Sequence, residues 1–142
     1  MKTFRRKMLL TMLVVLTVIA TAIPAFAIPH EIPYDFNLQT EGANSYLSSG
    51  EARYRETHNT SNTWMVNLKT ISKVDPYGNA TFWLAKRVDH DQVSKAHTIY
   101  AGTGNWNYNA FAAASEQWIV LGADNNDNVA CYVSGVWDEE TD

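Results

Sequence analysis

Four titratable residues, Asp89, His90, Asp91 and His97, lie within nine positions in the stretch DHDQVSKAH. Neutral imidazole nitrogens and carboxylate oxygens are ligands that hold zinc in proteins, so this cluster is the first candidate for a metal site. The two histidines are seven residues apart, however, which is wider than the short spacings of common zinc ligand pairs. We therefore interpret the first three residues as a solvated loop and His97 as a strand-edge histidine, and we predict no bound metal.

A second set of oxygen donors lies in the stretch DNNDN. Asp124, Asn126 and Asn128 match the first three ligand positions of an EF-hand calcium loop. The sixth position of such a loop requires glycine and is Val129 here, and the twelfth requires glutamate and is Gly135. The stretch is more typical of a hairpin turn than of a calcium site.

Side chains that could act in catalysis are scattered along the chain. There is no G-x-S-x-G nucleophile motif, and the single cysteine, Cys131, lies in an apolar strand-like stretch without a neighbouring base. A glycosidase needs two carboxylates that flank a cleft, and no spacing in the sequence pairs Glu41, Glu51 or Glu116 in this way. The sequence therefore predicts no catalytic residues and no cofactor.

Aromatic residues are the most informative feature of the composition. All five tryptophans fall in segments with strand character: Trp64, Trp83, Trp106, Trp118 and Trp137. Each large aromatic side chain can bury about 150–250 Å². Packing in the core is therefore the expected role for most of them.

The stretch NWNYNA has the strictest alternation in the chain. Trp106 and Tyr108 should point to one face of a strand, and Asn105 and Asn107 to the other. If the two rings are exposed, they can stack on sugar rings, while the neighbouring amides hydrogen-bond sugar hydroxyls. We predict these four residues as a ligand-binding site, with core packing of the two rings as the alternative.

Turn signals recur about every 8–12 residues after residue 47, which is the spacing of an all-β sandwich or barrel. A hairpin around the DPYGN turn is the natural pairing for the second and third strands, and WIVLGA is expected to be buried on both faces. We predict an antiparallel β-sandwich or small barrel. Its seven strands fall at residues 52–57, 63–71, 80–88, 96–102, 105–110, 118–123 and 129–137.

The N-terminal segment has the three parts of a secretory signal peptide. Four basic residues in the first seven positions precede an apolar run over residues 8–23, and an A-x-A site ends at Ala27. We expect cleavage after Ala27 and secretion of the mature chain. Residues 28–46, rich in proline and turn formers, are expected to form an extended arm, and residues 47–142 a single β domain with a short acidic tail.

Cleavage changes the charge of the protein. Four of the 11 lysines and arginines lie in the leader, which leaves seven against 15 acidic residues and a net charge of −8. Nucleic acids and anionic membranes are bound by basic surfaces, so neither a nucleic-acid partner nor stable membrane insertion is expected. A single cysteine, Cys131, excludes an intrachain disulfide, and secretion without disulfides suits a Gram-positive bacterium.

Several stretches resemble a family of small exported proteins of Gram-positive bacteria whose function is uncharacterised: GANSY, ARYRETHNTSNTWMVNL, TFWLAKRV, VSKAHT and VSGVWDEET. The resemblance implies genes close to ABC transporters of the bacteriocin-associated kind. The chain also looks distantly like lactococcin-type bacteriocins, although it is longer and acidic. No site residues follow from either resemblance.

Secretion, a β scaffold and surplus aromatic residues favour a secreted, non-catalytic recognition module that binds cell-wall glycan or a surface protein. The alternative is a bacteriocin-like or bacteriocin-associated factor, which rests on the resemblance. A secreted enzyme is the third hypothesis.

The cleavage site gives a direct test of the predicted leader. N-terminal sequencing of protein from culture supernatant should begin at Ile28, because signal peptidase recognises small residues in an A-x-A site. Cell-associated protein that still begins at Met1 would contradict both secretion and the charge of −8.

Overall fold

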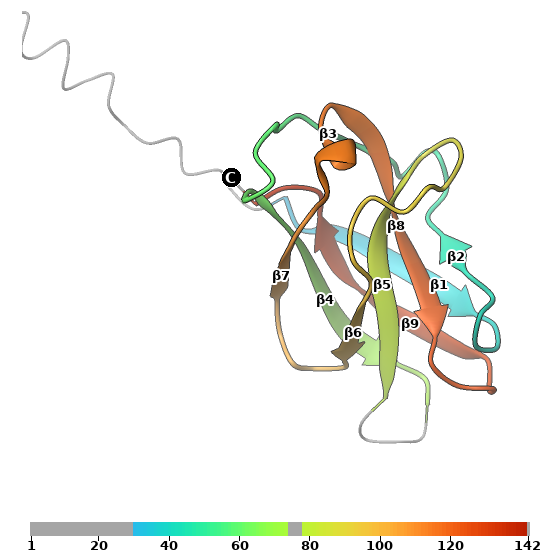
Figure 1. Cartoon of the computed structure of the whole chain (residues 1–142). Coiled ribbons are helices and arrows are strands. Elements are labelled where there is room, and N and C mark those ends of the chain that lie inside the picture. Colours follow the sequence, from blue (N-terminus) through green and yellow to red (C-terminus); the bar gives the residue numbers. More distant parts are fainter. Residues whose placement is uncertain (1–29, 74–77, 142) are drawn as a thin grey trace, which may run out of the picture.

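The protein is a sandwich of two antiparallel sheets, shown in Figure 1 as a computed structural model that describes residues 30–73 and 78–141. One sheet has the order β1-β9-β4-β7: β1 Ile32–Leu38, β9 Cys131–Asp138, β4 Thr63–Ile71 and β7 Trp106–Asn109. The other has the order β2-β8-β5-β6, with β3 also paired to β8: β2 Ser45–Tyr46, β8 Gln117–Asn125, β5 Asn79–Lys86, β6 His97–Tyr100 and β3 Arg53–Arg55. A short 3-10 turn, η1 Ala112–Ala114, precedes β8. The predicted all-β sandwich is confirmed.

Each of the seven predicted segments contains a strand, but the predicted hairpin between the second and third is wrong. These strands are β4 and β5, which lie in different sheets. β4 pairs with β7 and β9, and β5 pairs with β6 and β8. Both strands carry a row of buried apolar side chains. Because the chain crosses from one sheet to the other between β4 and β5, the two rows face each other across the same core. Most of the DPYGN turn lies outside the described residues.

The N-terminal segment belongs to the sandwich. The sequence predicts an extended arm over residues 28–46, whereas the structure makes β1 an edge strand that pairs with β9 along its full length. Tyr34, Phe36 and Leu38 alternate into the core, which explains why the segment is bound to the sheet. Pro33 is tolerated because an edge strand has one side without ladder hydrogen bonds. The predicted signal peptide, residues 1–27, lies outside the described residues.

The core lies between the two sheets and is built from alternating side chains. Trp64, Val66 and Leu68 of β4 are fully buried, as are Phe82 and Leu84 of β5. This matches the half-buried pattern expected from the sequence of β4. Within the described residues, no helix has the length and apolar character needed to cross a bilayer.

Gly135 in β9 leaves room for a hydrogen bond between the strands on either side of β9, from the Tyr34 side chain of β1 to the backbone of β4. Tyr34 of β1 lies opposite Gly135, and its hydroxyl donates a hydrogen bond of 3.2 Å to the Asn67 carbonyl of β4 on the other side. A Cβ atom at Gly135 would lie 1.9 Å from the Asn67 oxygen and 2.8 Å from the Tyr34 hydroxyl. Burial raises the pKa of the Tyr34 hydroxyl far above its ordinary value, so this group stays a hydrogen-bond donor.

The acidic C-terminal segment packs against the end of β3. The buried Arg55 guanidinium donates a hydrogen bond to the Glu139 carbonyl. The Glu140 carboxylate accepts hydrogen bonds from the backbone amides of Glu56 and Thr57, at 3.0 and 3.1 Å. These contacts bind the predicted acidic tail to the domain.

The close approach at Gly135 predicts a large effect of one methyl group. Gly135→Ala should lower the free energy of unfolding by about 1–3 kcal/mol or more, because the new Cβ forces the Tyr34 ring and the Asn67 carbonyl apart. Gly50→Ala is the matched control, since its Cβ would meet only the Ser48 hydroxyl at 3.8 Å. Urea denaturation measures both, and equal stabilities would contradict the close contact.

Candidate functional site

The two histidines considered as candidate metal ligands, His90 and His97, lie in separate aromatic stacks. His90 stacks on Tyr46 with ring centroids 4.1 Å apart, whereas His97 stacks on Tyr108 with centroids 3.6 Å apart. The Asp91 carboxylate faces the Lys86 ammonium at 3.5 Å. Over residues 30–73 and 78–141, no three His, Cys, Asp or Glu side chains are grouped so that they could hold a metal ion.

Two of the three oxygen donors in the DNNDN stretch, Asp124 and Asn126, accept hydrogen bonds from other parts of the chain. Both carboxylate oxygens of Asp124 accept hydrogen bonds from the backbone amide of Gly42, at 3.1 Å. The Asn126 side-chain oxygen accepts a hydrogen bond from the Thr81 hydroxyl at 2.8 Å, and its amide nitrogen donates to the Asn79 side-chain oxygen at 2.7 Å. Asp124 still belongs to β8, and these contacts join the stretch to the segment before β2 and to β5.

Of the four predicted ligand-binding residues, Trp106, Asn107 and Tyr108 lie on β7 and Asn105 immediately precedes it, but the two rings do not form an open pair. The Tyr108 ring contacts Trp64 at 5.6 Å and stacks on His97, so it belongs to the edge of the core. Trp106 is 45% exposed, and its indole N–H donates to the Thr103 hydroxyl at 2.8 Å. The predicted pair therefore offers one exposed ring rather than two.

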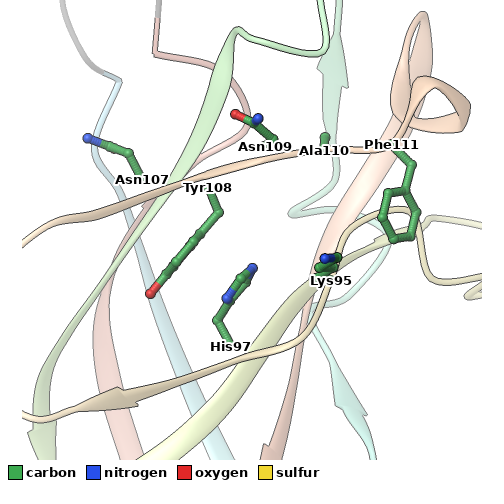
Figure 2. A pocket seen from close by; sticks show the side chains of 7 residues that line it. All are labelled: Lys95, His97, Asn107, Tyr108, Asn109, Ala110 and Phe111. Carbon is green, nitrogen blue, oxygen red and sulfur yellow. The ribbon is translucent and has the colours of Figure 1, made fainter.

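The asparagines of β7 face away from the rings. Asn105, immediately before β7, accepts a hydrogen bond on its side-chain Oδ1 from the Asn67 side-chain amide at 2.6 Å. In Figure 2, the Asn107 and Asn109 side chains project from the opposite side of the β7 backbone to Tyr108. The predicted combination of stacked rings and neighbouring amides is therefore divided between the two faces of one strand.

A pocket of about 450 Å³ opens beside the stacked rings (Figure 2). Tyr108 and Phe111 project from the β7 segment towards His97 and Lys95, which lie on β6 and the residues before it. Sequence reasoning selected two of its seven lining residues for ligand binding, Asn107 and Tyr108, and considered His97 only for metal. The lining residues are Lys95, His97, Asn107, Tyr108, Asn109, Ala110 and Phe111.

The electrostatics of this pocket favour an uncharged imidazole. Burial lowers the pKa of His97, and the positive charge of Lys95 lowers it further. Burial also raises the pKa of the Tyr108 hydroxyl. Among the described residues Lys95 makes no ion pair, so its ammonium is the one fixed charge in the pocket lining.

A different pair of rings is open to solvent on the second sheet. Tyr54 of β3 and Trp118 of β8 lie directly opposite each other, and they are 40% and 49% exposed. Their ring centroids are 5.6 Å apart with the planes at 63°. The Arg87 guanidinium lies over the Trp118 ring, 5.3 Å from its centroid. We call Tyr54, Trp118 and Arg87 the aromatic platform.

Sequence reasoning did not find the aromatic platform because its members are far apart in the chain. The run WIVLGA predicts a strand buried on both faces, and Ile119, Val120 and Leu121 are indeed fully buried. Trp118 lies near the start of β8, and its neighbour there is the short strand β3. Its ring is therefore exposed. The alternation of Tyr54 with Arg53 and Arg55 would even place the Tyr54 ring towards the core, whereas in the structure Arg55 is the buried side chain and Tyr54 is exposed.

The lowered pKa of His97 predicts a pH-dependent contribution to stability. An unfolded histidine has a pKa of about 6.5, so the unfolded chain binds this proton more readily. The contribution of His97 to stability is then lost as the pH falls below about 6.5. His97→Phe keeps a ring that can stack on Tyr108 but cannot take up a proton.

We therefore expect the melting temperature to fall less in His97→Phe than in the wild-type protein between about pH 7.5 and pH 5. Differential scanning fluorimetry at matched ionic strength measures the difference. The same fall in both proteins would show that protonation of His97 is not coupled to unfolding.

Comparisons with known proteins agree with the fold. No curated protein matches the chain. Among solved structures, the Yersinia pseudotuberculosis-derived mitogen (YPM) is similar, with a TM-score of 0.50, 16% identity and coverage of 81% of this chain and 90% of that chain. A likeness at this identity concerns the fold alone.

The family model described as "Protein of unknown function (DUF2712)" matches residues 23–141, in agreement with the resemblance to an uncharacterised family. The chain belongs to the DUF2712 family of proteins of unknown function.

Proposed function

We propose that the protein is a secreted, non-catalytic recognition module that binds carbohydrate, with cell-wall glycan as its target. The single observation that supports this proposal is the aromatic platform on the second sheet. Two exposed rings at one place on a rigid sheet are unusual for a surface that has no partner, because exposed apolar area is costly in water.

The platform has the two kinds of contact that a sugar requires. The C–H groups on one face of a pyranose ring carry slight positive charge and pack on the negative face of an aromatic ring. Arg87 supplies N–H donors for hydroxyl groups beside Trp118. Within the described part of the chain its guanidinium makes no ion pair.

The angle between the two rings favours a chain of sugars that is bent rather than flat. Trp118 and Tyr54 are inclined at 63°, so successive sugars that pack on them must turn relative to each other. This arrangement fits a twisted soluble glycan strand better than the flat surface of a crystalline polysaccharide.

The platform is held in place before a ligand binds. Tyr54 and Trp118 come from paired strands, and the Arg87 backbone amide donates to the Trp118 carbonyl at 2.9 Å. Side chains that are already positioned lose little conformational freedom on binding, which favours affinity.

Binding to glycans tests the proposal. Affinity electrophoresis in gels that contain soluble polysaccharides, together with pull-down on insoluble peptidoglycan, should show retention of the wild-type protein. Trp118→Ala should weaken binding at least about tenfold, equivalent to about 1.4 kcal/mol, because one of the two stacking surfaces is lost.

Trp106→Ala is the comparison variant, because Trp106 is exposed to a similar extent but lies on the other sheet. We expect it to bind like the wild-type protein, and circular dichroism should show that both variants are folded. Loss of binding in Trp106→Ala with retention in Trp118→Ala would transfer the site to β7. Failure of the wild-type protein to bind any glycan would refute a carbohydrate ligand.

A further inference from the structure

The pocket beside β7 differs from the aromatic platform in shape and in charge. It has a volume of about 450 Å³, and its lining combines the stacked Tyr108 and His97 rings with Phe111 and the charged Lys95. We propose that this pocket is a second binding site, separate from the glycan site, and that it takes a small carboxylate with an apolar ring.

The charge of the pocket favours an anion. Lys95 contributes a positive charge, and none of the seven lining residues is acidic. Although the net charge of the predicted mature chain is −8, an anion would meet only Lys95 and neutral groups here. The lining therefore selects a negatively charged group locally, in spite of the charge of the whole chain.

The single positive charge of the lining favours a carboxylate over a doubly charged anion. Lys95 supplies one cation, and His97 supplies a ring nitrogen that can donate one hydrogen bond when it carries a proton. One ammonium and one imidazole match the two oxygens of a carboxylate. A phosphate dianion carries two negative charges, of which the single lysine of this lining offsets only one.

The walls of the pocket favour an apolar ring beside that carboxylate. Phe111 is 44% exposed, and a ligand that covers its ring removes apolar surface from water at about 25 cal/mol per Å². The backbone amide of Phe111 is held by the Val93 carbonyl at 2.8 Å. The ring is thus offered from a fixed backbone position.

Binding in this pocket should be coupled to protonation of His97. The titratable groups that face the imidazole are Lys95, on the segment before β6, and Tyr108, on β7. β4 contributes Trp64, and β5 contributes the ladder partner Phe82, neither of which titrates. A bound carboxylate would offset the charge of Lys95 and favour the protonated imidazole.

Isothermal titration calorimetry with phenylacetate tests this inference on the full mature chain. Phenylacetamide, which has the same shape without the charge, is the matched ligand control. We expect phenylacetate to bind at least about tenfold more tightly than the amide, and several-fold more tightly near pH 5.5 than near pH 7.5. Both pH values keep an ordinary carboxylate ionised.

Variants assign the effect to the pocket. Lys95→Met should weaken binding of phenylacetate about tenfold, whereas Lys69→Met, at an exposed lysine of β4 outside the pocket, should not. His97→Phe should abolish the pH dependence. Equal affinity for phenylacetate and its amide, no binding by the wild-type protein, or equal effects of the two lysine variants would overturn the proposal.

The two sites are separable in the same experiments. Trp118→Ala should bind phenylacetate normally, and Lys95→Met should bind glycan normally, because neither residue belongs to the other site. A glycan that fails to bind while phenylacetate binds would refute the platform and leave the pocket intact. If Trp118→Ala instead loses phenylacetate binding while remaining folded, the assignment to the pocket is wrong.

Discussion

The pairing of β9 with β1 and β4 is the constraint on which the rest of the sandwich depends. The last strand of the chain lies between the first strand and a strand from its middle, so one sheet forms only when segments about 100 residues apart meet. Gly135 makes this possible at the centre of β9, because the absence of a side chain lets the Tyr34 hydroxyl reach the Asn67 carbonyl. Once this sheet is formed, its buried face provides one wall of the core.

The same principle of a glycine beneath an aromatic ring recurs on the second sheet. Trp83 lies opposite Gly122, and a Cβ at Gly122 would be 2.5 Å from the indole. Tyr46 then packs its ring against Trp83, and His90 stacks on Tyr46. His90, a residue type that can bind metals, thus packs on an aromatic cluster, because a planar imidazole can stack on another ring.

The surroundings of each tryptophan decide whether its side chain is buried in the core or exposed to solvent. Trp64, Trp83 and Trp137 are buried between or beside paired strands, whereas Trp106 and Trp118 are close to half exposed. Trp118 has Tyr54 and Arg87 as partners, which gives a composite surface. Trp106 is held by one hydroxyl. Recognition through aromatic residues is therefore better supported at the platform than at β7, although the type of residue is the same.

The sequence alone determines the properties that depend on near neighbours. Alternation of apolar and polar residues predicts the all-β class, the seven strands β3 to β9 and the inward face of Trp64 in β4, whereas for Tyr108 it predicts ligand binding with core packing as the alternative. The lack of ligand spacing likewise argues against a metal site at His90 and His97. These properties follow from side-chain period and local chemistry, which a short window of sequence contains.

Only the tertiary structure decides which strands are neighbours. It separates β4 from β5, makes β1 part of a sheet, and brings Tyr54 next to Trp118 across 64 positions of sequence. It also brings Lys95, before β6, and Phe111, after β7, to one pocket. Pairing of distant strands is selected by packing of the whole core and by the few places, such as Gly135, where side chains leave room. Such long-range complementarity has no local signature, so the ligand-facing surfaces emerge only when the sheets assemble.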